Sequence, residues 1–377
     1  MIKRLLISLF LLVIFVWLIW SSSGRKIQAP MPKPYLSMVQ EINPSDSLER
    51  NIVGIQPFMD EHDYLQPDIF KRKIELYLQI ARDSGFLKSN TLVLYPEYIG
   101  TWLVLQGEKH VLAEKKTLNE AMSTLVMSNI FDFSLAFFKT KEKDKAAASI
   151  FRMKAKEMAK TYFETFSSLA KDYQVYITAG SIILPQPAVI SGKLSVDPNG
   201  PLYNVSFLFD PEGNIMGSPI YKNFPVESEL PFLSSGESKD LPVFDLPMGK
   251  TSVLVCADSW YEDAYLNTIE NRAEIVLVPS FCPGDSTMNS PWKGYSGSIT
   301  PTSINESDIN LLTEGEAWKK YALPGKISQT SALVGLNIFL KGELWDLGAD
   351  GQPLAYLRGD TLEIQAAEQA GIWSLNF

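Results

Sequence analysis

The stretch TSVLVCADSWYEDAY, residues 251–265, decides how this chain is interpreted, because an apolar β-rich run in it ends at a cysteine. The chain has 377 residues but only two cysteines, Cys256 and Cys282. An acidic residue, Asp258, follows the first cysteine by two positions. A packing thiol, half of a disulfide, a metal ligand and a nucleophile are all open interpretations of Cys256 at this point.

The overall composition describes an acidic globular protein with ample apolar content for a core. The formal net charge of −9 argues against a nucleic-acid partner, because such partners need a basic surface. Two histidines and two cysteines make a His/Cys metal site unexpected, and we predict neither a metal nor a cofactor. His62 and His110 lie in charged, loop-like sequence, which indicates solvated surface residues.

Residues 1–24 form a separate unit. The apolar run at 5–20 has only Ser8 as a polar residue, and Lys3 and Arg4 precede it. Such a run belongs in a bilayer, and we predict an uncleaved membrane anchor whose short basic head stays in the cytoplasm. The rest of the chain is then extracytoplasmic. A cleaved signal peptide is the alternative, but the bulky VWLIW end offers no small-residue cleavage site.

Residues 25–50 are expected to connect this anchor to the globular part of the chain. The stretch QAPMPKPY contains Pro30, Pro32 and Pro34. Closely spaced prolines favour a stiff, extended chain. We therefore predict a proline-rich tether and lead-in, followed by one domain over residues 51–377.

From residue 51 onward the sequence alternates between strand and helix patterns. Short apolar runs that predict buried strands are NIVGIQPFM, TLVLYPEY, QVYITAGSIILP, TSVLVCAD and EIVLVPS. Helical spacing of apolar residues occurs at 70–85, 151–173 and 259–273, and hairpin patterns occur at 203–222 and 337–357. Mixed βα and ββ units of this kind indicate an α/β fold in which helices cover sheets.

Functional side chains in such folds gather beyond the carboxyl ends of the strands. Five residues lie at or just past these ends: Glu97, Ser181, Lys222, Cys256 and Ser280. Buried cysteines are usually packing residues, but Cys256 lies where a strand gives way to a predicted helix. A helix N-terminus favours a thiolate, so we interpret Cys256 as a candidate nucleophile.

Three short motifs follow one another in the chain: LYPEY around Glu97, YKNF around Lys222 and LVCADSWY around Cys256. In this order, and with connecting segments such as VFDLPMGK, the sequence resembles the nitrilase, or carbon-nitrogen hydrolase, superfamily over about residues 51–357. The resemblance implies a four-layer α-β-β-α sandwich and a catalytic Glu-Lys-Cys triad.

The resemblance also assigns a role to each residue. Cys256 attacks the substrate carbonyl and forms a thioester, while Glu97 moves protons and then activates water. Lys222 stabilises the tetrahedral intermediate. A supporting glutamate is expected before Gly236, where Glu229 matches the family spacing and Glu227 is the neighbouring alternative.

The substrate is less defined than the triad. The stretch SWYEDA replaces the family's usual arginine-phenylalanine-proline-glutamate element after the cysteine, so Tyr98, Trp260 and Tyr261 are only candidates for lining the pocket. The resemblance implies hydrolysis of a non-peptide carbon-nitrogen bond in a small-molecule amide. Acyl transfer from a lipid-like donor to an amine at the membrane surface is the alternative, and relatives commonly form homodimers.

Several other interpretations remain open. A disulfide between Cys256 and Cys282 suits an exported domain, and a binding domain without catalysis can keep the same fold. A serine hydrolase using Ser181 or Ser280 lacks both a G-x-S-x-G elbow and an evident base. The helical insertion at about 101–150 is either a helix covering the sheet or a lid or membrane-facing flap; the role of Cys282 is open.

Overall fold

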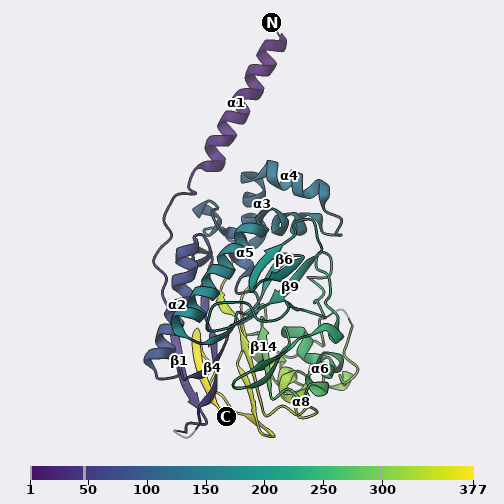
Figure 1. Cartoon of the computed structure of the whole chain (residues 1–377). Coiled ribbons are helices and arrows are strands. Elements are labelled where there is room, and N and C mark those ends of the chain that lie inside the picture. The colour runs from purple at the N-terminus through teal and green to yellow at the C-terminus, as the bar shows by residue number, and fades with distance from the viewer. Residues whose placement is uncertain (1, 46–47, 298) are drawn as a thin grey trace.

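The computed structural model of the chain describes residues 2–45, 48–297 and 299–377. Residue 1 of the predicted anchor and residues 46 and 47 of the predicted lead-in lie outside the described residues. Two six-stranded sheets form the centre of the domain, with helices α2 and α5 beside one of them and α6 and α8 beside the other (Figure 1). The α/β class and the layered sandwich predicted from the sequence are confirmed.

The first sheet combines both ends of the domain. Its strands, in spatial order, are β1 (Leu36–Ile42), β19 (Ala370–Asn376), β2 (Arg50–Gln56), β4 (Asn90–Leu94), β5 (Tyr176–Thr178) and β10 (Leu208–Phe209). β2, β4 and β5 run parallel, whereas β19 is antiparallel to β2. Helices α2 (Pro67–Asp83) and α5 (Lys145–Tyr173) bury their apolar faces with the outward-facing residues of this sheet.

The second sheet carries the cysteine-bearing strand. Its strands, in spatial order, are β12 (Val243–Leu246), β13 (Gly249–Val253), β14 (Ile275–Ser280), β15 (Val334–Phe339), β17 (Leu354–Leu357) and β18 (Asp360–Leu362). β13, β14 and β15 are parallel. Its helices are α6 (Leu266–Glu270), α7 (Glu314–Tyr321) and α8 (Leu323–Ile327), and apolar residues of α7 and α8 join its core.

The two sheets pack closely where β2 faces β15. Gly54 of β2 lies against Leu336 and Ile338 of β15, and a Cβ atom at this glycine would come within 2.6 Å of the Ile338 side chain. Only a residue without a side chain fits this approach. The shared interior also contains Trp373 of β19, which is fully buried.

Smaller elements complete the domain. β6 (Ile182–Pro185), β9 (Leu202–Ser206) and β11 (Ile220–Tyr221) form a three-stranded sheet, and two-stranded pairs join β3 (Phe58–Asp60) to β16 (Lys341–Glu343) and β7 (Pro187–Ile190) to β8 (Lys193–Val196). 3-10 turns occur at Glu61–Tyr64, Thr101–Leu105, His110–Leu112, Ser238–Asp240, Cys256–Trp260, Glu262–Tyr265, Thr287–Asn289 and Glu306–Asp308.

Two predicted elements differ from the structure. The run QVYITAGSIILP is two strands rather than one, because the chain leaves the first sheet at Gly180, whose φ is +65° and whose α-hydrogen faces the Pro96 carbonyl. The helix predicted directly after Cys256 is wrong. Two short 3-10 turns and the five-residue α6 occupy that stretch instead.

The N-terminal helix α1 (Ile2–Ser22) projects from one end of the domain (Figure 1). It is long and apolar enough to cross a membrane. The segment that follows, which we expected to be a tether, contacts the domain. Ala29 joins the core, the carbonyls of Lys33 and Pro34 accept hydrogen bonds from Lys73 and Tyr77, and β1 pairs with β19.

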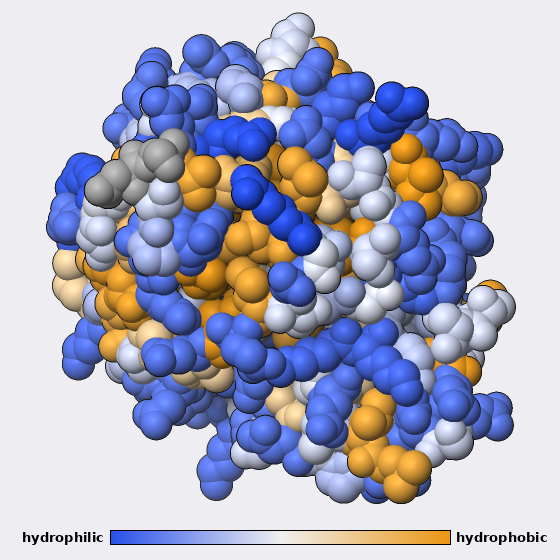
Figure 2. Space-filling model, turned by 90° about the horizontal axis from the view of Figure 1, so that it is seen from below, coloured by the Kyte–Doolittle hydropathy of each residue, from blue (hydrophilic) through white to orange (hydrophobic). Residues whose placement is uncertain are grey.

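The predicted insertion at about 101–150 includes two complete α-helices and the start of α5, and these helices differ in burial. α5 lies against the first sheet, but most of α5 follows the insertion, so this contact does not confirm the prediction of a covering helix. α3 (Leu118–Ser128) and α4 (Ile130–Lys139) meet at an angle of 98°. Figure 1 shows α4 at the same end of the domain as α1. The opposite end of the domain is mostly hydrophilic around its rim, with hydrophobic residues gathered toward its middle (Figure 2).

Candidate active site

The three predicted triad residues follow strands of three different sheets. Glu97 follows β4 of the first sheet, Lys222 follows β11 of the three-stranded sheet, and Cys256 follows β13 of the second sheet. All three residues are buried. Lys222 Nζ lies 2.8 Å from Glu97 Oε1, and the charges of both groups act on the Cys256 thiol. The fold therefore brings together residues that are far apart in the sequence.

Glu229 is the second carboxylate of this cluster. Its Oε2 lies 2.7 Å from Lys222 Nζ and accepts a hydrogen bond of 2.8 Å from the backbone N–H of Val226. The hydroxyl of Tyr98 donates to its Oε1. Glu227, the alternative left open by the sequence, is exposed and contributes nothing to these contacts.

Asn204 of β9 joins the two carboxylates and was missed in the sequence analysis. Its Nδ2 donates to Glu97 Oε1 at 2.8 Å and to Glu229 Oε1 at 3.0 Å. Its backbone carbonyl accepts from the N–H of Lys222 at 2.9 Å. A polar residue between apolar neighbours in LYNVSF was the available signal, since a buried amide in a strand needs partners.

Cys256 has an unusual backbone conformation. Its φ is +51°, in the left-handed region that residues with a side chain rarely adopt. The residue is only 6% exposed, and its Sγ donates to the carbonyl of Phe281 at 3.6 Å. Strained backbone of this kind occurs preferentially at functional sites, where the surrounding structure holds it in place.

Asp258 connects the cysteine turn to the lysine-bearing loop. Its Oδ1 accepts from the backbone N–H groups of Asn223 and Phe224, each at 2.9 Å, and its Oδ2 accepts from Val255 at 3.3 Å. Burial raises the pKa of Asp258 to about 7, although these N–H groups and Lys222 oppose the rise. This carboxyl group thus positions Lys222 relative to Cys256, a role that the sequence motif did not reveal.

The pKa values of the two carboxyl groups in the cluster are shifted in opposite directions. Burial raises the pKa of Glu97, and the charge of Glu229 adds to this effect while Lys222 opposes it. Burial also acts on Glu229, but Lys222, Tyr98 and the Val226 N–H outweigh it and lower its pKa. These opposite shifts favour an ionised Glu229 and make Glu97 the carboxyl group that takes up a proton more readily.

The remaining two ionisable groups favour a neutral thiol beside a charged lysine. Burial lowers the pKa of Lys222, but the negative charges of Glu229 and Glu97 outweigh it and raise the pKa well above its ordinary value. Burial and the charge of Glu97 raise the pKa of the Cys256 thiol. The expectation that a helix N-terminus would favour a thiolate is thus wrong, because the element that begins at Cys256 is a five-residue 3-10 turn and burial raises the pKa of the thiol. The proton of Cys256 must leave through a base.

The three pocket candidates lie in different surroundings. Tyr98 is half-buried and its ring is 5.5 Å from that of Phe281. Trp260 is buried among aromatic rings, with Trp318 at 5.1 Å. Tyr261 stacks on Phe224 with ring centroids 3.6 Å apart. Tyr98 contacts the charged cluster directly, because its hydroxyl donates a hydrogen bond to Glu229.

The competing nucleophiles are engaged elsewhere. Ser181 Oγ accepts from the backbone N–H of Tyr98 at 2.9 Å, and Ser280 Oγ accepts from Asn337 at 2.7 Å. Cys256 and Cys282 are both free thiols, so the structure contains no disulfide between them. Ser181 therefore acts as a support for the loop that carries Glu97.

The groups that could hold a metal ion lie apart from this cluster. Asp60, Glu61 and His62 place three ligand atoms within 4.8 Å of one another. All three groups already have internal partners. Asp60 accepts from the His62 N–H, Glu61 accepts from a backbone N–H, and His62 Nδ1 lies 3.4 Å from Asp60 Oδ1. The rings of His62 and His110 pack at 4.9 Å and both residues are half-buried, in contrast to the solvated surface positions predicted for them.

Comparison with known proteins identifies the family. A sequence model described as carbon-nitrogen hydrolase matches residues 92–301, a region that includes Glu97, Lys222, Glu229 and Cys256. The chain belongs to the carbon-nitrogen hydrolase family. This finding agrees with the nitrilase-superfamily resemblance noted in the sequence.

Curated relatives match a shorter part of this family member. The deaminated glutathione amidase of Dictyostelium discoideum is 30% identical over 139 residues, which cover 34% of this chain and 44% of the relative. The probable hydrolase YhcX of Bacillus subtilis is 27% identical over 129 residues, covering 34% of this chain and 22% of the relative. The chain thus matches less than half of the length of either relative.

Solved structures support the fold over most of the chain. The amidase from Nesterenkonia sp. has a TM-score of 0.52 at 16% identity, covering 88% of this chain and 92% of the amidase. A mutant of the Nesterenkonia sp. AN1 amidase, with the acetamide moiety of fluoroacetamide added covalently at its active-site cysteine, has a TM-score of 0.51 at 16% identity and the same coverage. At this identity the similarity concerns the fold.

Proposed function

We propose that this carbon-nitrogen hydrolase cleaves a small-molecule amide through a thioester on Cys256. The observation that carries the proposal is the buried cluster in which Lys222 lies within 2.8 Å of carboxylate oxygens from both Glu97 and Glu229, beside the Cys256 thiol. Burying this many charges is costly, and a cluster of this kind suits catalysis better than stability. Family membership and the amidase names among the relatives favour an amide substrate.

In the first half-reaction the sulfur of Cys256 attacks the amide carbonyl carbon. Glu97 removes the thiol proton as the carbon–sulfur bond forms, which its raised pKa makes possible. Lys222, whose raised pKa keeps it charged, stabilises the negative oxygen of the tetrahedral intermediate. The carbon–nitrogen bond then breaks, and Glu97 gives the proton to the departing amine.

In the second half-reaction water replaces the amine. Glu97, again a carboxylate, removes a proton from water as a carbon–oxygen bond forms at the thioester. The carbon–sulfur bond breaks, and the proton held by Glu97 returns to the sulfur. The products are a carboxylic acid and the free thiol. No oxidant, reductant or metal enters this sequence.

Asn204, Glu229 and Asp258 act as positioning residues in this scheme. Asn204 holds the two carboxylates in a fixed relation, and Glu229 balances the charge of Lys222. Because Glu229 stays ionised, Glu97 is free to exchange protons with the reacting atoms. Asp258 keeps the loop with Lys222 against the cysteine turn.

We further propose that α1 remains as a membrane anchor and leaves the domain on the extracytoplasmic side. Its length of 21 residues, about 32 Å, matches the hydrocarbon thickness of a bilayer. Membrane attachment favours one alternative reaction, in which an amine rather than water accepts the acyl group from a lipid-like donor. Both reactions pass through a thioester on Cys256. They differ in the acyl donor, which is an amide in one and a lipid-like molecule in the other, and in the acceptor, which is water in one and an amine in the other.

The proposal is tested by locating the covalent intermediate. The purified full chain is incubated with a panel of amides, and the acylated peptide is identified by mass spectrometry. We expect the added mass on Cys256 and its release by water with formation of the acid. An adduct on another residue, or amide turnover that survives in the C256S variant, contradicts the proposal. Release of the adduct by amines alone replaces hydrolysis with acyl transfer.

A further inference from the structure

The helical insertion carries an apolar surface that the globular domain does not cover. α4 contains no buried residue. Three of its large side chains are strongly exposed: Phe131 by 59%, Leu135 by 64% and Phe138 by 86%. These positions follow an i, i+4, i+7 spacing, so they share one face of the helix. A continuous apolar face of this kind marks an interaction site in a folded protein.

The membrane-spanning candidate α1 touches this surface. Trp17 Nε1 donates to the Met127 carbonyl at 2.9 Å, and the rings of Trp17 and Phe131 meet edge to face at 5.0 Å. Trp17 lies five residues before the end of α1, a rise of about 7.5 Å along the helix. The start of α4 therefore lies at the level of the last turns of α1.

Polar contacts fasten α1 to the joint between α3 and α4. Arg25, just after α1, donates to the Ser128 carbonyl at 3.3 Å and to Asn129 Oδ1 at 3.0 Å. The same guanidinium pairs with the buried Glu108 at 3.1 Å, and Glu108 also pairs with Lys154 of α5 at 2.7 Å. Because Ser128 and Asn129 connect α3 to α4, these contacts fix the direction of α4 relative to α1.

Resting on the proposed anchoring of the chain by α1, we propose that α4 and the end of α3 form a second membrane-contacting element, which seats the domain on the same bilayer. We assign the bilayer as the partner of this exposed face, because the last turns of α1 contact the end of α3 and the start of α4. The last turns of a helix that spans the hydrocarbon lie at the boundary with the lipid headgroups. At that depth Phe131, Leu135 and Phe138 enter the acyl-chain boundary, as in an interfacial amphipathic helix.

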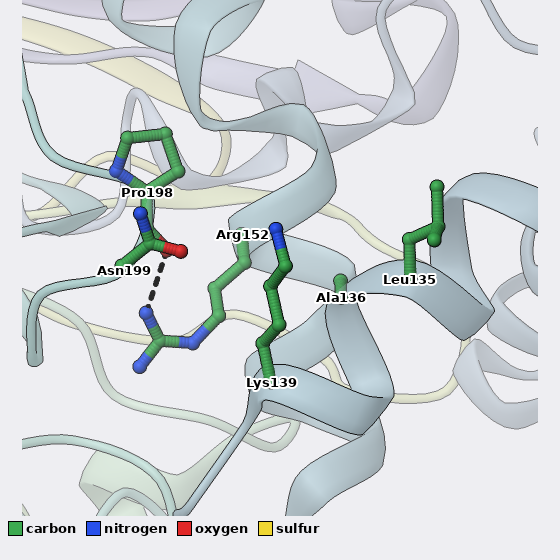
Figure 3. Close-up of a pocket in the computed structure, with 6 residues that line it drawn as sticks. All are labelled: Leu135, Ala136, Lys139, Arg152, Pro198 and Asn199. Atoms are coloured by element: carbon green, nitrogen blue, oxygen red, sulfur yellow. Dashed lines mark hydrogen bonds between the residues drawn. The ribbon is translucent and has the colours of Figure 1, made fainter.

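Basic side chains border the apolar face. Lys139 ends α4, and three exposed lysines follow it in the turn toward α5 and at the start of that helix: Lys141, Lys143 and Lys145. Beside them lies a pocket of about 160 Å³ between α4 and α5, where Lys139 extends next to Arg152 (Figure 3). Arg152 is engaged with the Pro198 carbonyl at 2.8 Å, whereas Lys139 is exposed. Lysines at headgroup depth are attracted to lipid phosphates.

The test measures the depth of α4 in vesicles of phosphatidylcholine. The full chain, with residues 1–24 verified by intact mass, is reconstituted in a C256A/C282A background and labelled with an environment-sensitive fluorophore at L135C. The matched control is L311C, another exposed leucine (78%), in the loop before α7. We expect quenchers on the lipid acyl chains to quench the label at position 135 severalfold more than the label at 311, and aqueous iodide to do the reverse.

Equal quenching at the two positions overturns the proposal. A second variant separates α4 from α1: the label stays at L135C, and F131D and F138D are added. We expect lipid quenching to fall to the level of the control. Unchanged quenching would mean that α1 alone brings the label to the membrane. Turnover of a soluble amide, measured with Cys256 and Cys282 restored, reports separately on the proposed reaction.

Discussion

The active-site cluster and helix α4 depart from the usual burial of side chains in opposite directions. In the cluster, two glutamates and a lysine are buried almost completely. On α4, two phenylalanines and a leucine face solvent. Neither arrangement favours stability in water, because buried charges lose hydration and exposed apolar groups are poorly hydrated. In both regions the burial of the side chains is the opposite of what their polarity predicts. Both are also regions where we propose that the protein acts on another molecule.

The largest expected effect is the loss of activity when the sulfur is removed. We expect C256A to lower kcat by on the order of 10³-fold or more, because the chain's other thiol, Cys282, lies outside the charged cluster. C282A is the matched control, since Cys282 is equally buried but lies outside the charged cluster. Amide turnover that survives in C256A, or is lost in C282A, would contradict the assignment.

The two neighbouring glutamates give a sharper comparison. E229Q removes the counter-ion of Lys222 and should lower kcat by about 10- to 100-fold, whereas E227Q, which changes an exposed residue, should have little effect. A purely structural role of Glu229 would lower the amount of folded protein but leave the pH profile of kcat unchanged. We instead expect that profile to shift, because Glu229 acts on the pKa of Glu97.

Asp258 should make the stability depend on pH. Its pKa of about 7 in the folded protein exceeds the ordinary value of 3.8, so the folded chain keeps a proton that the unfolded chain has lost between these values. The free energy of unfolding therefore falls as pH rises through this window, by about 1.4 kcal/mol per pH unit from this group. Urea unfolding at pH 5, 6 and 7 gives the free energy of unfolding as a function of pH. We expect this free energy to fall less steeply with pH in D258N than in the native protein; an equal dependence on pH in the two proteins would exclude the effect.

The smallest expected effect concerns the stability contribution of α4. F138A should change the free energy of unfolding by no more than about 0.5 kcal/mol, because the ring is 86% exposed. F166A is the comparison, since Phe166 of α5 is fully buried and its loss should cost about 3–5 kcal/mol. Urea unfolding in detergent measures both changes. A large cost for F138A would show that α4 packs on the domain and is not a free surface.

Much of the fold and the candidate site could be predicted because the signals are local. Apolar runs ending in Glu97 and Cys256 predicted buried strands with functional groups at their ends, and the structure contains those strands. Asn204 and Asp258 could not be placed in the same way. Asn204 bonds to residues that lie 25 and 107 positions away in the sequence, and Asp258 bonds to residues that lie 34 and 35 positions away. No local sequence pattern encodes contacts over such separations.

The errors have a similar cause. Gly180 sends the chain from one sheet to another, although the apolar pattern continues through it. The stretch after Cys256 has helical spacing, but Asp258 ties its first turn to Asn223 and Phe224, and 3-10 turns result. In the N-terminal segment, Pro34 suggested an extended tether; the chain is extended, but its carbonyls pair with α2.

The most direct test of the central claim is the rate at which fluoroacetamide alkylates Cys256, measured as a function of pH in the native protein and in E97Q. If the carboxylate accepts the thiol proton, the native rate should rise with pH as Glu97 ionises, and E97Q should react about 10²- to 10⁴-fold more slowly and lose that rise. Equal rates and equal pH profiles in the two proteins would show that Cys256 reacts without Glu97 and would contradict the account.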